Sequence, residues 1–323
     1  MKKMIIVIFI QCCLLCLASS MYGQTTAYDY FTLGEGARRD HRYAEAISFY
    51  EKAAELQRGN DWTHTEILNS IGEVYREMGQ YDHALVYFRK SLAMDEVIGQ
   101  QRNIAGRSNN IGLIYFAWGQ YHHALEYYEK ALKISKGLGD ESLVAGALNN
   151  IGEIYRIWDR QDSALEYFME SKSILDSLDL RNTSDYAALM NNMGSVSLSN
   201  KDYDQAFEYY MKSKSIRDAL GHYNTAEYAK LMNNIGNVFR SKDKPEEALK
   251  YYMNSKSIWE KIGLQNTAGY GVMFYNLALL YEELGNRVMA GSYYRMAYDT
   301  FARASYTGSE RAKAYSNAKR LGY

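Results

Sequence analysis

A doublet of aromatic residues recurs seven times along the 323-residue chain, and its spacing constrains the fold more than any other feature. The steps between successive doublets are 38, 40, 40, 42, 42 and 42 residues. A near-constant period of this length indicates one supersecondary unit repeated in tandem. The doublets are Phe49-Tyr50, Tyr87-Phe88, Tyr127-Tyr128, Tyr167-Phe168, Tyr209-Tyr210, Tyr251-Tyr252 and Tyr293-Tyr294.

Two small residues keep the same register in the repeat. An alanine stands four residues before the second aromatic residue of every doublet, from Ala46 to Ala290. A glycine stands twelve residues before that alanine in six units, and Ala278 replaces it in the seventh. Because glycine inside a helix costs about 1 kcal/mol relative to alanine, its repetition predicts close packing of two helices, with the alanine as the matching small residue. The glycines are Gly34, Gly72, Gly112, Gly152, Gly194 and Gly236.

Each unit is predicted to contain two helices. Apolar residues around the glycine, and again around the alanine, recur at i, i+3, i+4 and i+7, which is one face of an α-helix. Short polar turns such as residues 78–80 predict that the two helices are antiparallel neighbours. The second helices are expected to end at a left-handed residue, and Asn-Thr pairs before the later units are candidate N-caps. The expected left-handed residues are Gly99, Gly139, Asp179, Gly221 and Gly263, and the pairs begin at Asn182, Asn224 and Asn266.

Residues 109–132 read Asn-Asn-Ile-Gly-x-Ile-Tyr and then Gly-Gln-Tyr-x-x-Ala-Leu-x-Tyr-Tyr-x-Lys-Ala-Leu. This pattern resembles the tetratricopeptide repeat, and the resemblance covers about residues 27–303. The spacings of 40 and 42 residues are similar to the long-helix repeats of kinesin light chains and Pins-type adaptors. The resemblance implies an all-α fold, a right-handed superhelical α-solenoid of seven antiparallel helix pairs. The polar segment after Ala304 is interpreted as a C-terminal capping helix, which solenoids need at their ends.

The N-terminal segment predicts export from the cytoplasm. Lys2 and Lys3 precede an apolar run of about 15 residues, and small residues follow, which is the pattern of a secretory signal peptide. The run is shorter than the roughly 20 residues that a membrane-spanning helix needs, although a retained anchor stays an alternative. We expect cleavage between Ser20 and Gln24, no integral membrane segment in the processed chain, and a periplasmic, secreted or cell-envelope protein of bacterial type. The predicted organisation is a signal peptide at 1–24, a repeat array at 25–305 and the capping helix at 306–323.

Several functional classes find no support in the sequence. All three cysteines lie within residues 12–16, so the processed chain would have no thiolate nucleophile and no cysteine metal ligand. A formal net charge of −1 argues against nucleic acid as the main partner. His83 and His123 are expected to be exposed on second helices rather than to bind metal. Without a phosphate-binding, dinucleotide or nucleophile–base motif, we expect no enzyme, no cofactor and no metal.

The resemblance implies that the first helix of each pair lines a concave groove. Its groove-facing positions include the two residues before the Ile-Gly step, and these are mostly asparagine. An amide offers both a donor and an acceptor, which suits the backbone of an extended peptide; alternatively, the amides bridge adjacent first helices. Further groove candidates are charged, or aromatic as in Tyr28, Phe31, Phe116 and Tyr275. The predicted peptide-binding residues are Asn69, Asn109, Asn110, Asn149, Asn150, Asn191, Asn192, Asn233, Asn234, Arg76, Arg156 and Arg240.

Two functions are compatible with these features. The first is a non-enzymatic interaction scaffold or adaptor outside the cytoplasm, which binds a peptide or a partner protein in the concave groove. The second is a ligand-sensing regulatory module that acts in trans with a membrane signalling protein. Repeat arrays share one fold across unrelated tasks, so the sequence does not identify the partner.

Overall fold

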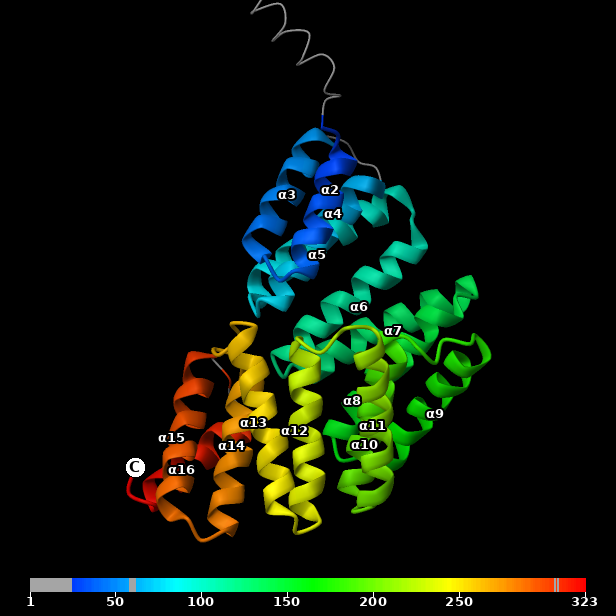
Figure 1. The fold of residues 1–323 in the computed structure, drawn as a ribbon. Coiled ribbons are helices and arrows are strands. Elements are labelled where there is room, and N and C mark those ends of the chain that lie inside the picture. Colours follow the sequence, from blue (N-terminus) through cyan, green and yellow to red (C-terminus); the bar gives the residue numbers. More distant parts are fainter. Residues whose placement is uncertain (1–24, 58–61, 305, 307) are drawn as a thin grey trace, which may run out of the picture. The chain divides into compact units, whose positions relative to one another are not determined.

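The computed structural model describes residues 25–57, 62–304, 306 and 308–323, and every regular element in these ranges is an α-helix (Figure 1). The helices form seven pairs, followed by α16 at Ser309–Arg320. This confirms the predicted all-α solenoid of helix pairs with a capping helix. The predicted signal peptide at 1–24 lies outside the described residues.

Each pair consists of a first helix and a second helix of similar length. The first helices are α2 Ala27–Arg39, α4 Trp62–Glu77, α6 Gln101–Ala117, α8 Glu141–Ile157, α10 Ser184–Ser199, α12 Ala226–Ser241 and α14 Ala268–Glu283. The second helices are α3 Tyr43–Leu56, α5 Tyr81–Ile98, α7 Tyr121–Leu138, α9 Gln161–Ser177, α11 Tyr203–Ala219, α13 Pro245–Lys261 and α15 Arg287–Arg303. The chain divides into two compact units: unit 1 contains α2–α5, and unit 2 contains α6–α16.

The helix ends follow the predicted local chemistry. The five residues expected to adopt the left-handed conformation all have positive φ, including Asp179 at 56°. In the later units the threonine of the Asn-Thr pair is the N-cap: Thr225, for example, accepts a hydrogen bond from the Tyr228 N–H at 3.1 Å. Pro245 is the first residue of α13, where a missing N–H leaves no helix bond unmade. These caps explain where the helices of each pair begin and end.

The repeated glycine packs mainly against an aromatic ring; at Gly152 the backbone of the predicted alanine is also close, with the Ala164 carbonyl oxygen 3.2 Å from an added Cβ. A Cβ atom added at Gly236 would lie 2.6 Å from Cε1 of Tyr252, the second residue of the aromatic doublet. The same holds for Gly72 with Phe88, also at 2.6 Å. The alanine that was expected to fill this role is buried one turn earlier on the second helix. The ring reaches further than the helix backbone, so it is the ring that excludes a larger residue at the glycine position.

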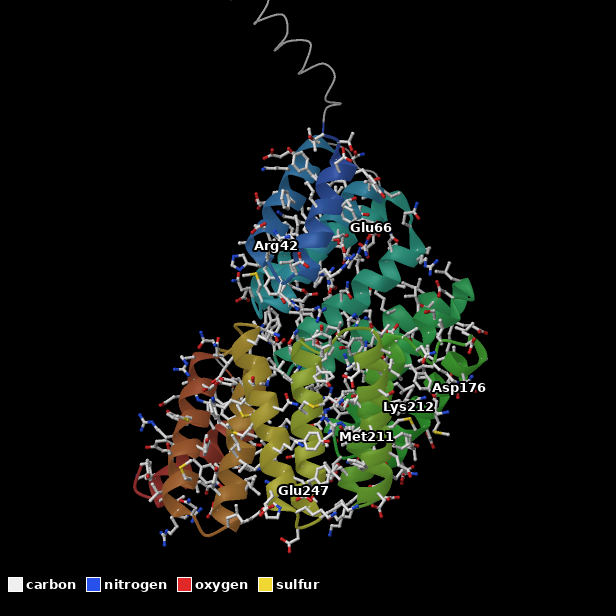
Figure 2. The ribbon with its side chains drawn as sticks, viewed as in Figure 1. Arg42, Glu66, Asp176, Met211, Lys212 and Glu247 are labelled. Carbon is white, nitrogen blue, oxygen red and sulfur yellow. The ribbon has the colours of Figure 1, made fainter. Side chains whose placement is uncertain are left out.

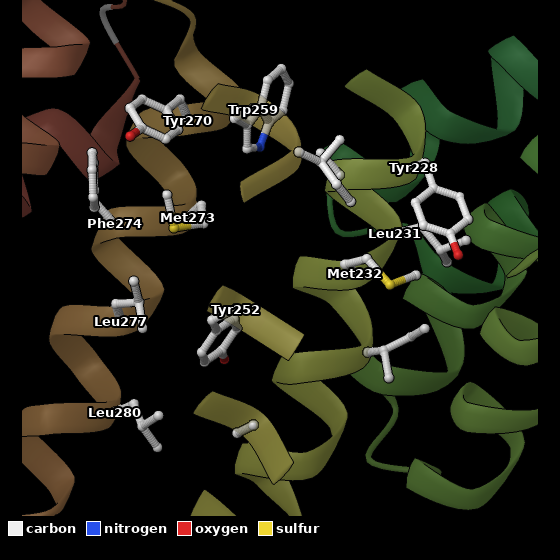
Figure 3. Packing of buried hydrophobic residues seen from close by; sticks show 14 of the residues in the cluster. Tyr228, Leu231, Met232, Tyr252, Trp259, Tyr270, Met273, Phe274, Leu277 and Leu280 are labelled. Atoms are coloured by element: carbon white, nitrogen blue, oxygen red, sulfur yellow. The ribbon is translucent and has the colours of Figure 1, made fainter. Parts of the chain in front are cut away.

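A buried serine on the second helix bonds the first helix and so fixes the position of one helix along the axis of the other. Ser213 on α11 donates to the carbonyl oxygen of Ala187 on α10 at 2.7 Å, and Ser255 on α13 donates to Ala229 on α12 at 2.7 Å. Ser171 makes the equivalent bond in the preceding pair. These bonds lie beside the apolar core, of which Figure 3 shows the part around α12–α14. Each bond satisfies a buried hydroxyl and sets the height of the second helix against the first.

A carboxylate in the last turn of a second helix positions the next first helix. Asp218 accepts from Lys214 Nζ and from the Tyr228 hydroxyl, both at 2.6 Å. The same arrangement occurs at Asp176, which Figure 2 labels, and at Glu260. Burial opposes ionisation of Asp176, but the hydrogen bonds that it accepts lower its pKa below the usual value. The anionic carboxylate therefore links successive pairs in the later part of unit 2.

The glycine–ring contact predicts opposite effects for two glycine-to-alanine substitutions. Gly236→Ala should destabilise the protein by about 1–3 kcal/mol because the new methyl group overlaps the Tyr252 ring. Gly106 lies inside α6 with no heavy atom within 4 Å of an added Cβ, so Gly106→Ala should stabilise it by up to about 1 kcal/mol. Urea denaturation followed by circular dichroism measures both effects. Equal midpoints for the two variants would show that the ring does not determine the glycine register.

Candidate binding face of the first helices

In unit 2 the first helices form the inner layer of the stack. Contacts join α6 with α8, α8 with α10, α10 with α12, and α12 with α14, in addition to the contacts within each pair. Among the described elements, the second helices make no equivalently close contacts with one another. A layer whose neighbouring helices lie closer together is on the inner side of a curved stack. We call the exposed side of this layer the inner face of unit 2.

A ladder of asparagine side chains runs across the inner layer. In each step, the second asparagine of one first helix donates from Nδ2 to Oδ1 of the first asparagine in the preceding first helix. Four such bonds connect five helices: Asn150 to Asn109 at 2.8 Å, Asn192 to Asn149 at 3.1 Å, Asn234 to Asn191 at 3.1 Å and Asn276 to Asn233 at 3.0 Å.

The ladder confirms the interpretation that the amides bridge adjacent first helices. Asn191 and Asn192 also bond to each other at 3.3 Å, so both members of a pair lie in the ladder. Asn69, in α4 of unit 1, and Asn110, in α6, are partly buried and have interactions of their own. Both halves of the Asn191 and Asn192 amides make hydrogen bonds, whereas the ladder bonds of Asn150 and Asn234 use only the NH2 half of each amide. Whether any of the predicted amides also bonds a peptide backbone stays a prediction.

Two of the three predicted arginines, Arg76 and Arg156, are neutralised by a glutamate three residues earlier. Arg156 forms two bonds of 2.7 Å to the carboxylate of Glu153, three residues earlier on α8. Burial opposes the charge of Arg156, but this carboxylate keeps its pKa above the ordinary value. In unit 1, Nε and Nη2 of Arg76 both donate to Oε2 of Glu73, three residues earlier, and the shorter bond is 2.7 Å. These arginines therefore already have an internal partner.

Arg240, the third predicted arginine, has different surroundings. Its Nε atom is 3.9 Å from the Glu283 carboxylate, which is beyond hydrogen-bonding distance. Its Nη1 atom is buried and has no hydrogen-bond partner among the described residues. The position three residues earlier is Asn237 rather than glutamate, and its Oδ1 accepts a bond from the Tyr252 hydroxyl at 2.7 Å.

The residue that follows a repeated glycine was predicted as a groove candidate only where it is a glutamate, and Ser195 and Asn237 were missed. In the first and fifth units the hydroxyl of the ring packed on the glycine reaches this residue: Tyr50 bonds Glu35 at 2.5 Å and Tyr210 bonds Ser195 at 3.0 Å. Burial raises the pKa of Tyr210 to about 12, so the hydroxyl is protonated at neutral pH. The constant offset of one residue from the glycine was the signal that could have identified this row.

The aromatic groove candidates have diverse environments. Phe116 packs against Tyr121 at a centroid distance of 5.5 Å, and Tyr275 packs against Tyr294 at the same distance. Phe31 packs against Tyr50 at 5.5 Å, whereas Tyr28 is 74% exposed. Phe116 and Tyr275 thus support the inner layer of unit 2, and Phe31 and Tyr28 belong to α2 of unit 1.

His83 and His123 are exposed on second helices, as predicted, and each stacks on a first-helix tyrosine. Across the described ranges, no three His, Cys, Asp or Glu side chains are grouped closely enough to hold a metal ion. None of the helices described in the structure combines the length and the apolar character needed to cross a membrane.

Comparison with known proteins agrees with this architecture. Models of the tetratricopeptide repeat match residues 25–96, 105–177 and 227–303, and a further one matches residues 187–220. The chain belongs to the tetratricopeptide-repeat family. A curated relative, the photosystem I assembly protein Ycf3 of Synechococcus sp. (strain CC9605), is 35% identical over 66 residues, which are 20% of this chain and 38% of that protein.

Two solved structures show the same fold at low sequence identity. The apo form of RapI matches with a TM-score of 0.64 and 22% identity, covering 87% of this chain and 99% of that chain. The Rap conjugation gene regulator of the plasmid pLS20, in complex with the Phr* peptide, matches with a TM-score of 0.70 and 17% identity. That match covers 86% of this chain and 74% of the regulator.

The ladder predicts a measurable stability contribution at its buried end. Asn276→Ala should destabilise the protein by about 1–3 kcal/mol because the buried Oδ1 of Asn233 loses its donor. Asn254→Ala, on the exposed side of α13, should change stability by no more than about 0.5 kcal/mol. Denaturation midpoints of the two variants test this, and an Asn276 variant as stable as the wild type would exclude a structural role for the ladder.

Proposed function

We propose that this protein is a non-enzymatic interaction scaffold that binds an extended peptide, or an extended segment of a partner protein, along the inner face of unit 2. The observation that carries the proposal is a pair of open glycines on that face. Gly106 and Gly146 lie three residues before the ladder asparagines Asn109 and Asn149, hence on the same side of their helices. An added Cβ at either glycine would meet no heavy atom within 4 Å.

These open glycines have no packing role that would offset their cost in a helix. Glycine is used inside helices where another backbone must approach closely, and here the approach would come from outside the chain. The carbonyl half of the amide that the ladder does not use at Asn150 and Asn234, and the charged residues beside the ladder, would supply polar contacts. The complex of the plasmid pLS20 Rap regulator with the Phr* peptide supports this proposal, because a protein of the same fold holds a peptide.

The proposed location is the periplasm or the cell surface. It rests on the basic, apolar and small-residue pattern of residues 1–24. A regulatory module that acts in trans with a membrane signalling protein would use the same inner face and differ only in its partner. Crosslinking of the captured partner in intact cells, followed by mass spectrometry, distinguishes a membrane signalling protein from a soluble envelope protein.

A steric block at the open glycines tests the binding face. Gly146→Tyr should fold normally, because the position faces open space, and should abolish capture of partners from envelope extract by covering the inner face. The matched control is Gly137→Tyr on α7, a second helix, where an added Cβ also meets no heavy atom within 4 Å. Affinity capture read by mass spectrometry compares them. Equal capture by both variants would place binding elsewhere.

A further inference from the structure

One arginine of the inner layer lacks the internal carboxylate that others have. At Arg76 and Arg156 the residue three positions earlier is a glutamate that forms charge-assisted hydrogen bonds with the guanidinium. The residue three positions before Arg240 is Asn237, a neutral amide that is already bonded to Tyr252. Arg240 therefore lacks the internal neutralisation that Arg76 and Arg156 have at the equivalent positions of their own repeats.

The surroundings of Arg240 do not replace the missing carboxylate. Its side chain is 21% exposed, so it is mostly removed from water but still open on one side. The Nη1 atom is buried without a hydrogen-bond partner in the described part of the chain, which is costly for a charged donor. The nearest carboxylate, Glu283 on α14, is 58% exposed and stays 3.9 Å away.

We propose that Arg240 is the anion anchor of the inner face and binds a carboxylate of the peptide that occupies it. The planar guanidinium presents paired N–H donors that match a carboxylate with two parallel bonds. Arg156 does not compete, because Glu153 already satisfies it in this way. The inference rests on the proposed function and adds to it a ligand class: a peptide with an Asp or Glu side chain, or a free C-terminal carboxylate, at this position.

Three fluorescein-labelled peptides test the anchor by fluorescence anisotropy: C-terminally amidated hexaglutamate, amidated hexaglutamine, and hexaglutamine with a free C-terminus. The wild-type protein should bind a carboxylate-bearing peptide at least about tenfold more tightly than amidated hexaglutamine. The two acidic probes distinguish a side-chain carboxylate from a terminal one. Equal binding of all three peptides, or no binding of either acidic peptide, would overturn the anchor.

Two substitutions then assign the effect to Arg240. Arg240→Gln removes the charge, and Asn237→Glu keeps the arginine but gives it the internal partner that Arg156 has. Both should remove the preference for carboxylates, with circular dichroism as the check on folding. An Asn237→Glu variant with undiminished preference would contradict the proposal.

The reverse substitution provides a gain of function. Glu153→Asn should uncover Arg156 and tighten binding of amidated hexaglutamate several-fold, because a second guanidinium becomes available. Unchanged binding would contradict the inference that Glu153 keeps Arg156 from binding a peptide carboxylate. The Gly146→Tyr variant separates this inference from the proposed function: if it abolishes binding of amidated hexaglutamine while all three peptides bind the wild type equally, the inner face binds peptides but Arg240 is not an anchor.

Discussion

The contact between a first-helix glycine and the second ring of the aromatic doublet is the constraint on which the rest of each helix pair depends. With a Cβ at Gly194 or Gly236, the ring of Tyr210 or Tyr252 could not occupy its place. The ring fixes the distance between the helices, and the buried serine bond fixes their height. Once both are set, the carboxylate of Asp218 can reach Tyr228 on the next first helix.

These contacts determine which side of the first helix is available for binding. The side of the first helix that carries the glycine is covered by the aromatic ring of its own second helix. The side that carries Tyr228 is covered by the preceding pair, through Asp218. The asparagines lie between neighbouring first helices and close the layer, which keeps the inner face continuous from α6 to α14. The exposed inner surface is thereby reduced to a few rows, of which the open glycines and Arg240 are members.

Much of the pair architecture could be predicted from the sequence, because period, glycine register and caps are local properties. The cap at Thr225 and the left-handed Asp179 follow from residue chemistry within a few positions. The partner of the glycine could not be predicted, since spacing does not reveal how far the Tyr252 ring reaches. The donor and acceptor of each ladder bond are asparagines 41 or 43 residues apart, so which asparagine bonds which could be read only from the structure.

The candidate site was predicted in part. The sequence placed Arg156 and Arg240 in one class, whereas the structure separates them by the partner three residues away. The sequence did contain the distinguishing feature, Asn237 in place of a glutamate, but its meaning depends on the Tyr252 hydroxyl that occupies the amide. Membership of the repeat family predicts the fold. The proposal that the ligand carries a carboxylate comes instead from Arg240, whose charge has no hydrogen-bonded internal carboxylate.

Photocrosslinking tests the central claim, that partners bind along the first helices of unit 2, most directly. Lys230 is exposed on α12 and lies six residues before the repeated Gly236. Gly106 and Gly146 lie six residues before the repeated glycines of their own helices, so a benzoylphenylalanine residue in place of Lys230 would be in the equivalent position. The same residue in place of Lys212, which Figure 2 labels on α11, would report on the second helices. We expect crosslinks to the captured partner from position 230 and none from position 212. Crosslinks from position 212 alone would contradict it.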